Sequence, residues 1–237
     1  MVLYLGALLA WGSFYFARPD YFWKGILIAA FYAAFDVLWT YFRDKNWYFP
    51  ESSLISGFIL ALVGAPAPSL SLLILMPLLA VISKQLLRFG TGRHIFNPAA
   101  FSLVVGPILS VFSPRLIGLG PTWWGVSWGA PVMYAVLAAG IFILWRQRRW
   151  ETALPFLAAY ALLFNFQVFN GTVIFFASVM LIEPITSSFL GVRQRMAYGA
   201  LVFLLTFLVG RSGLNSDPLL LGLLGGNIIF NLMKFAK

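Results

Sequence analysis

The stretch GTGRHIFNPAAF, residues 90–101, is a polar turn between two long apolar segments. Gly90 and Gly92 allow the backbone to change direction sharply. Pro98 suits the first position of a following helix, and Asn97 suits its N-cap. A helix that begins here presents free N–H groups and a positive dipole end. This geometry favours contact with an anionic or carbonyl-rich ligand.

The composition on both sides of this turn is typical of a membrane protein. Of the 237 residues, 61% are hydrophobic and 10% are charged, whereas soluble domains average about 45–50% and about 25%. Basic loops that fix membrane topology explain the net charge of +9 better than nucleic-acid binding does. Cysteine is absent, which excludes disulfides and cysteine-held metal clusters. With one histidine, we expect no metal site.

Hydrophobic segments predict about ten transmembrane helices, because a span needs roughly 20 apolar residues, or fewer where it is broken. The segments lie near residues 2–17, 24–42, 52–65, 69–88, 98–113, 129–146, 152–168, 171–190, 196–211 and 217–235. We therefore predict an all-α polytopic membrane protein with a single membrane domain, residues 1–237. The first segment lacks a basic start and a cleavage site, so we interpret it as a retained helix.

Positive charge indicates the orientation of these helices. With both termini in the cytoplasm, 12 of the 16 basic residues lie on the cytoplasmic side. The other four are Arg18, Lys24, Arg115 and Arg211. We expect a multi-pass protein of the plasma membrane with the 114–129 loop outside. The tryptophans of that loop suit either an interfacial belt or an aromatic wall for a flat ligand.

Two short stretches of the sequence are similar to each other, as expected for an internal repeat. GRHIFNP (92–98) resembles GNIIFNL (226–232), so Phe96 and Asn97 match Phe230 and Asn231. Two halves with an odd number of spans would be inverted in the membrane. Both interpretations stay open: two inverted five-helix repeats, 1–113 and 129–237, or a chance match.

Charged residues inside apolar segments mark a partner, a cavity or a function. Asp36 lies in AAFYAAFDVLWTYF, and we expect it to pair with Arg43 or Lys45 unless it is an ion or proton site. Lys84 and Arg88 are one helical turn apart. They either snorkel to the interface or bind an anionic or carbonyl-rich ligand.

Glu183 is the most informative of these residues. It lies in FFASVMLIEPITSSFLG (175–191), and Pro184 must interrupt the helical hydrogen bonds. Three hydroxyl side chains follow: Thr186, Ser187 and Ser188. Carboxylate and hydroxyl oxygens suit a small cation, so we predict an ion or proton site at Glu183 and Thr186, with Asp36 as a second candidate. We expect Glu183 either to have a partner, with Lys84 as the first candidate, or to be protonated during the working cycle. We interpret His94 as a surface or ligand-contacting residue.

Several segments together resemble the NqrB/RnfD family of membrane subunits. They are SLISGFILALVGAP (53–66), ISKQLLRFGTGRHIFNPAAF (82–101), FFASVMLIEPITSSFLG (175–191), MAYGALVFLLTFLVG (196–210) and GLLGGNIIFNLM (222–233). The matches follow the same order along most of the chain. The most specific are the Lys–x7–Gly-Arg–x3–Asn-Pro-Ala pattern and the acid-Pro pattern.

The resemblance implies a ten-helix fold related to urea and ammonium channels. It also implies flavin bound within the helices and electron transfer across the membrane, coupled to Na⁺ or H⁺ movement in some complexes. The positions expected to contact the flavin are Lys84, Arg93, His94, Phe96, Asn97, Thr186, Ser187 and Asn231.

One departure concerns the type of flavin attachment. Family members carry FMN esterified to a threonine in a Ser-Gly-Ala-Thr motif, and the corresponding 114–129 loop contains GPTWWG instead. Thr122 is the only threonine in this loop. We therefore expect riboflavin or FMN to be bound noncovalently rather than on Thr122.

The leading hypothesis is a flavin-binding electron-transfer protein, a component of an oxidoreductase complex rather than a stand-alone enzyme. Its expected partners are the lipid bilayer and other membrane subunits of an Rnf-like complex, an extracytoplasmic flavoprotein, or a second copy of the chain. The alternative is a transporter or channel for riboflavin or another small solute. No nucleic-acid partner is expected.

Overall fold

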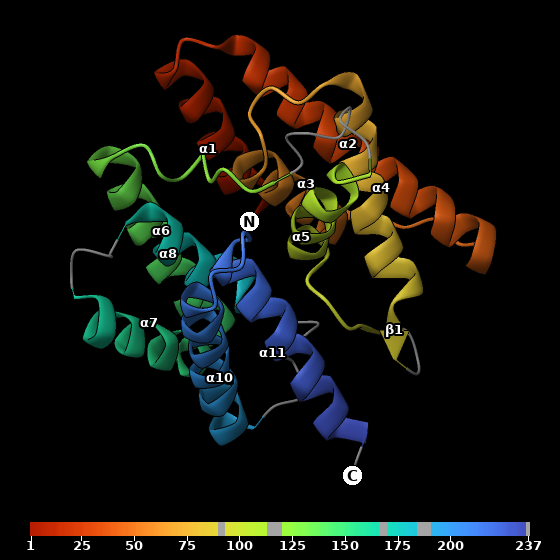
Figure 1. The fold of residues 1–237 in the computed structure, drawn as a ribbon. Helices are drawn as coiled ribbons and strands as arrows, with labels where there is room; N and C mark the ends of the chain where they lie inside the picture. The colour runs from red at the N-terminus through yellow and green to blue at the C-terminus, as the bar shows by residue number, and fades with distance from the viewer. Residues whose placement is uncertain (90–92, 113–119, 166–169, 184–190, 236–237) are drawn as a thin grey trace. The chain divides into compact units, whose positions relative to one another are not determined.

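The computed structural model describes residues 1–89, 93–112, 120–165, 170–183 and 191–235. Figure 1 shows their helices, which are α1 (Val2–Tyr15), α2 (Pro19–Asp44), α3 (Glu51–Val63), α4 (Leu70–Leu86), α5 (Pro98–Ser110), α6 (Ala130–Gln147), α7 (Trp150–Phe164), α8 (Gly171–Phe175), η3 (Phe176–Met180), α10 (Val192–Arg211) and α11 (Pro218–Phe235). A hairpin pairs β1 (Arg88–Phe89) with β2 (Arg93–His94). A helix lies at each of the ten predicted hydrophobic segments, with α8 and η3 continuous.

The described residues include three helices that are long and apolar enough to cross a membrane: α2, α6 and α10. The other apolar helices have 10–17 residues, with α8 and η3 counted together and α11 counted from Pro218 to Met233. This agrees with the expectation of short or interrupted spans. The prediction of a helical membrane protein is confirmed at this level. The ten-span topology, the repeat and the channel-like fold stay predictions.

The chain forms two compact units. Unit 1 contains residues 1–88 and 98–125, and unit 2 contains residues 89–97 and 126–237. In unit 1, α2 packs against α3 and α4, α1 packs against α2 and α3, and α5 packs against α3 and α4. Gly57 lets α3 approach α2 closely, because a Cβ there would lie 2.6 Å from the Cα of Ala29.

The segment 120–125 closes the carboxyl end of α3. The backbone N–H groups of Thr122 and Trp123 donate to Val63, and the indole of Trp124 donates to Ala61 at 2.6 Å. These bonds satisfy the last carbonyls of the helix. Trp123 and Trp124 are each 7% exposed. The expectation of an interfacial belt is wrong for these two residues, because they pack inside unit 1.

In unit 2, α10 packs against α7 and α11, while α6 packs against α8 and η3. Gly199 brings α10 against α7, because a Cβ there would lie 2.0 Å from the carbonyl oxygen of Thr152. Gly222 does the same between α11 and Thr206 of α10. Small residues commonly allow such close packing in membrane helices.

The helix predicted over 171–190 differs from the structure in its extent. It begins as expected, with Asn170 Oδ1 accepting from the N–H of Val173 at 3.1 Å. It changes into the wider turns of η3 and ends at Met180, so Glu183 lies beyond its end. The predicted helix break at Pro184 lies outside the described residues.

Candidate functional site

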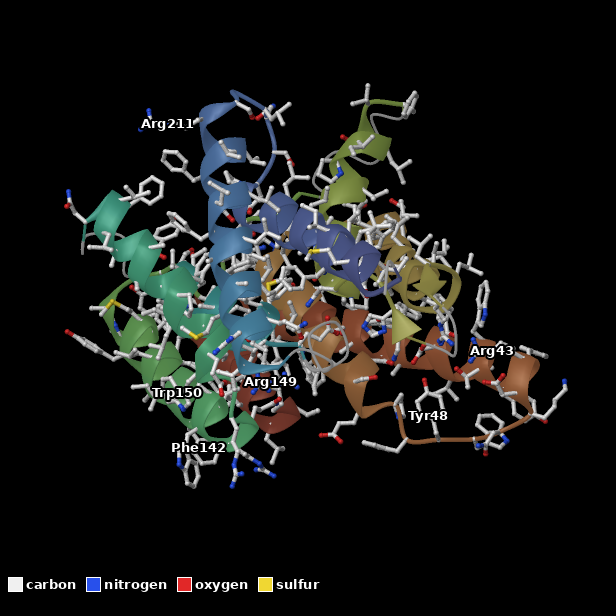
Figure 2. The ribbon with its side chains drawn as sticks, turned by 90° about the horizontal axis from the view of Figure 1, so that it is seen from below. Arg43, Tyr48, Phe142, Arg149, Trp150 and Arg211 are labelled. Atoms are coloured by element: carbon white, nitrogen blue, oxygen red, sulfur yellow. The ribbon has the colours of Figure 1, made fainter. Side chains whose placement is uncertain are left out.

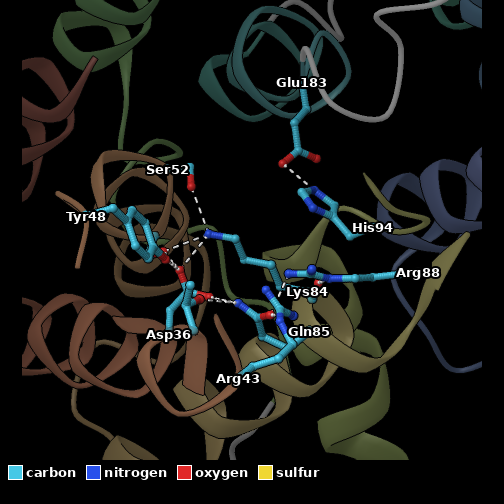
Figure 3. A network of polar contacts seen from close by, with 11 residues as sticks. Asp36, Arg43, Tyr48, Ser52, Lys84, Gln85, Arg88, His94 and Glu183 are labelled. Carbon is cyan, nitrogen blue, oxygen red and sulfur yellow. Dashed lines mark hydrogen bonds and ion pairs between the residues drawn. The ribbon is translucent and has the colours of Figure 1, made fainter. Parts of the chain in front are cut away.

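Asp36 is the centre of a buried polar network in unit 1. It lies in α2 and is 0% exposed. The side chains that donate hydrogen bonds to its carboxylate are Lys84, Ser53, Tyr48 and Gln85, and Figure 3 labels Lys84, Tyr48 and Gln85 around it. Lys84 Nζ lies 2.8 Å from Oδ2, and Gln85 Nε2 lies 2.5 Å from Oδ1. Helices α2, α3 and α4 and the loop after α2 therefore all contribute to this site.

Lys84 places its ammonium group against three oxygen atoms. Nζ lies 2.8 Å from each of Asp36 Oδ2, Ser52 Oγ and Ser53 Oγ. An ammonium group has three hydrogens to donate, so these contacts match its full capacity. The lysine side chain is only 11% exposed, and its charge is balanced by the carboxylate of Asp36.

Gln85 connects the buried pair to two arginines at its edge. Its Oε1 accepts from Arg43 Nη1 at 2.8 Å and from Arg88 Nη2 at 2.5 Å. Its Nε2 donates to Asp36 and to Thr40. Burial and the neighbouring charge of Arg43 lower the pKa of Arg88. Gln85 therefore donates to the Asp36 carboxylate and itself accepts hydrogen bonds from Arg43 and Arg88.

Tyr48 reaches the same carboxylate from the loop between α2 and α3. Burial, and then the hydrogen bond to Asp36, raise the pKa of Tyr48 to about 12. The phenol stays protonated near neutral pH and donates its hydrogen to Asp36.

The predicted partners of Asp36 were wrong. Arg43 bonds to Asp44 and Gln85, and Lys45 lies 5.7 Å from the centre of the Phe42 ring. Spacing along α2 suggested these residues, but packing of α2 against α4 supplies Lys84 instead. Within unit 1 the Lys84 ammonium is bound by Asp36, Ser52 and Ser53, and the expected pairing of Lys84 with Glu183 stays a prediction.

A second acid–base pair lies in unit 2. Glu183 Oε1 is 3.3 Å from His94 Nε2, and the two side chains are 16% and 4% exposed. Figure 3 draws this contact beside the carboxyl end of η3. The interpretation of His94 as a surface residue was wrong, because it is buried against Glu183. Wide helical turns such as η3 occur frequently at functional sites.

Amide side chains fix the backbone around this pair. Asn97 Nδ2 donates to the carbonyl of Met180 at 3.5 Å, just before Glu183. Asn231 Nδ2 donates to the carbonyls of Ile95 and Asn227, at 3.2 and 2.7 Å. Residues 95–97 are thereby joined to the end of η3 and to α11. Asn97 and Asn231, which match each other in the two similar stretches of sequence, both form hydrogen bonds that hold residues 95–97 in place.

Buried polar groups of α10 and α11 lie close to the pair. Tyr198 is fully buried, donates to Asn227 Oδ1 at 2.5 Å and interacts electrostatically with Glu183. Among the described residues, Asn227 Nδ2 is buried without a hydrogen-bond partner. Such a group needs an explanation, and it gives unit 2 a polar interior near Glu183.

The structure distributes the remaining predicted residues as follows. Phe96 lies in unit 2 with His94 and Asn97. Thr122 Oγ1 donates to the carbonyl of Gly64 at 2.6 Å. The side chain of Arg93 and all of Thr186, Ser187 and Ser188 lie outside the described residues.

Sequence reasoning missed several contributors to both sites. In unit 1 they are Tyr48, Ser52, Ser53 and Gln85, and in unit 2 they are Tyr198 and Asn227. Gln85 beside Lys84 and the paired serines at the start of α3 were the available signals. Each is a polar residue at the edge of an apolar helix, and only packing shows that it faces inward.

Three of the residues expected to contact a flavin, Lys84, His94 and Asn231, make polar contacts within the protein itself. Lys84 already gives its hydrogens to Asp36, Ser52 and Ser53. Asn231 gives both amide hydrogens to backbone carbonyls, and Glu183 lies against Nε2 of His94. These donors serve the protein itself, so we assign no flavin contact to them.

Comparison with known proteins supports the resemblance. No family model matches the chain. The chain is similar to RnfD of the ion-translocating oxidoreductase complex of Klebsiella pneumoniae (strain 342), with 30% identity over 142 residues, 54% of this chain and 38% of the relative. The protein of the same name from Escherichia coli (strain SMS-3-5 / SECEC) is 29% identical over 140 residues, 53% of this chain and 37% of the relative.

The chain thus spans less than two fifths of the length of the curated relatives it matches. A third relative, from Escherichia coli O7:K1 (strain IAI39 / ExPEC), carries the same name and matches to the same extent. These similarities confirm the predicted resemblance of this chain to the NqrB/RnfD family.

Proposed function

We propose that this chain is a membrane-embedded component of an ion-translocating oxidoreductase complex and that its buried carboxylates carry the translocated Na⁺ or H⁺. One observation supports the proposal most strongly. Each unit of this apolar protein contains a carboxylate beside a basic partner: Asp36, which is buried, with Lys84, and Glu183, which is partly buried, with His94. Ionisable groups inside membrane helices are costly and usually serve a function.

The pair in unit 1 suits exchange between a lysine and a mobile cation. The hydroxyl oxygens of Ser53 and Tyr48 contact the Asp36 carboxylate, and Ser52 Oγ lies 2.8 Å from Lys84 Nζ. Hard oxygen atoms of this kind are the ligands that small cations prefer. In the proposed cycle, Asp36 binds Lys84 in one state and a cation or proton in the other. The site is neutral while Asp36 binds Lys84. In the other state it stays neutral only when Lys84 releases its proton as the cation or proton binds Asp36, which avoids the cost of an unbalanced buried charge.

The pair in unit 2 suits a protonation step. A histidine changes charge between pH 5 and pH 8 more readily than any other side chain. A protonated His94 would balance the negative charge of the Glu183 carboxylate. Once His94 has lost that proton, the carboxylate would be available to bind a cation. Asn97 and Asn231 hold the surrounding backbone in place while the charge changes.

Electron transfer in such a complex belongs to the proposal as well. The resemblance predicts riboflavin or FMN, bound noncovalently, with further proteins of the complex that supply and remove electrons. No step is assigned to the flavin, because the described candidate side chains are engaged with the protein. The proposed location is the plasma membrane, with both chain termini in the cytoplasm.

Purification of the tagged chain with its associated proteins tests the proposal. A yellow preparation whose visible absorbance bleaches on reduction is the expected result. In proteoliposomes, electron transfer through the complex should drive uptake of ²²Na⁺ or protons. A colourless preparation that moves riboflavin in liposomes without electron transfer would support the transporter alternative and contradict the proposal.

A further inference from the structure

The corner between α6 and α7 in unit 2 carries a basic cluster. We call Arg146, Arg148, Arg149 and Arg195 the arginine corner. The first three lie at or beside the end of α6, and Arg195 comes from α10, which packs against α7. Burial and the charge of Arg195 lower the pKa of Arg149, so these two arginines lie within electrostatic range. Figure 2 labels Arg149 beside Trp150 at this end of the unit.

The backbone turn at the corner sets two arginines in fixed positions. Arg148 adopts a left-handed conformation with φ of 51°. The N–H of Arg149 then donates back to the carbonyl of Leu144 at 3.2 Å. This bond satisfies an end carbonyl of α6. Beside the turn, Trp145, Arg146 and Arg148 line a recess of about 230 Å³.

No ion pair within the described part of the chain balances the charge of this recess. All seven Asp and Glu side chains are described, and none of their ion pairs includes Arg146 or Arg148. The acid beside the corner is Glu151, and it binds Arg195 at 3.4 Å. Two guanidinium groups therefore share a recess with no carboxylate bound to them in the described part of the chain.

The surroundings of the recess match a membrane boundary. Helix α6 is one of the three described helices that are long and apolar enough to span a membrane, and the recess lies at its end. Trp145 is 68% exposed and Phe142 is 53% exposed. Exposed aromatic rings beside arginines are typical of the headgroup level of a bilayer.

We propose that the recess formed by Trp145, Arg146 and Arg148 binds the phosphate group of an anionic phospholipid. Guanidinium groups bind phosphate oxygens through paired hydrogen bonds. The exposed Trp145 ring provides an apolar surface for the glycerol and the upper acyl chain. Basic recesses beside membrane helices bind acidic lipid headgroups on the same principle. The recess shares no residue with either buried acid–base pair.

Native mass spectrometry of the detergent-purified chain tests this site. Phosphatidylglycerol is titrated against the parent, the Arg146→Gln/Arg148→Gln variant and the control Arg211→Gln. Arg211 ends α10, at the opposite end of that helix from Arg195, and Figure 2 shows it far from Arg149. The double variant should bind the lipid about 10- to 30-fold more weakly, whereas the control should bind it like the parent.

Two further arms separate the possible sources of the phosphate. Phosphatidylcholine with the same acyl chains should bind clearly more weakly than phosphatidylglycerol. Inorganic phosphate at the same concentration should not displace the lipid. The proposal is overturned if the double variant retains phosphatidylglycerol as the parent does, if phosphatidylcholine binds equally well, or if inorganic phosphate displaces the lipid.

Discussion

Replacing Lys84 by Met tests whether the buried pair in unit 1 is a coupled unit. The change leaves the Asp36 carboxylate buried and deprived of its cation, which costs about 3–5 kcal/mol of unfolding free energy for a buried pair. Tyr48, Ser53 and Gln85 still donate to the carboxylate. We therefore expect a loss near the lower end, about 3 kcal/mol.

The magnitude follows from two opposing terms. At 2.8 Å and an effective dielectric constant of about 20, the attraction between the charges is about 6 kcal/mol. Burial of the two ions costs several kcal/mol each, so the pair as a whole contributes little net stability. The variant Asp36→Asn/Lys84→Met removes both charges and keeps a side-chain oxygen as acceptor. It should recover most of the loss.

The assay is unfolding of the purified protein in detergent, followed by tryptophan fluorescence. The matched control is Arg18→Met, which breaks the exposed pair of Arg18 and Asp20 and should leave stability almost unchanged. A Lys84→Met variant as stable as this control would refute the reasoning. A double variant no more stable than Lys84→Met would refute it too.

Three further predictions concern topology, the flavin and Tyr48. A cysteine at Gln147 should react with impermeant reagents only from the cytoplasmic side, and one at Gly120 only from outside; the reverse pattern would contradict the orientation. Acid precipitation should release any bound flavin, whereas fluorescence that stays on a denaturing gel and disappears in Thr122→Ala would show covalent attachment. The pKa of Tyr48 is raised to about 12 from about 10, so its contribution to stability is complete below about pH 10 and is lost as pH rises to about 12. Alkaline unfolding curves should therefore fall more steeply for the parent than for Tyr48→Phe, and equal slopes would contradict the assignment.

The helices could be predicted because apolar runs and turn residues are local signals. Residues 24–42 predicted most of α2, which begins earlier because Pro19 occupies its first turn. Residues 171–190 predicted a longer helix than the structure shows, since hydrophobicity continues past Met180 where η3 ends. Composition cannot locate such an end, because the change from ordinary to wide turns depends on packing.

The partners of the charged residues could not be predicted from spacing. Asp36 and Lys84 are 48 residues apart and meet because α2 packs against α4. Glu183 and His94 are 89 residues apart. The energetic cost of a charge inside an apolar segment identified Asp36 and Glu183 as unusual residues. Only the three-dimensional arrangement identifies the side chains that balance their negative charges.

Cation uptake per transferred electron in the reconstituted complex tests the central claim most directly. Glu183→Gln should fold and insert normally but lose most of the coupled uptake, because the amide keeps the volume and removes the negative charge. Glu183→Asp should retain part of it, and the exposed Glu51→Gln should behave like the parent. If Glu183→Gln translocates as many ions per electron as the parent between about pH 6 and pH 8, the carboxylate is structural and the proposed role is wrong.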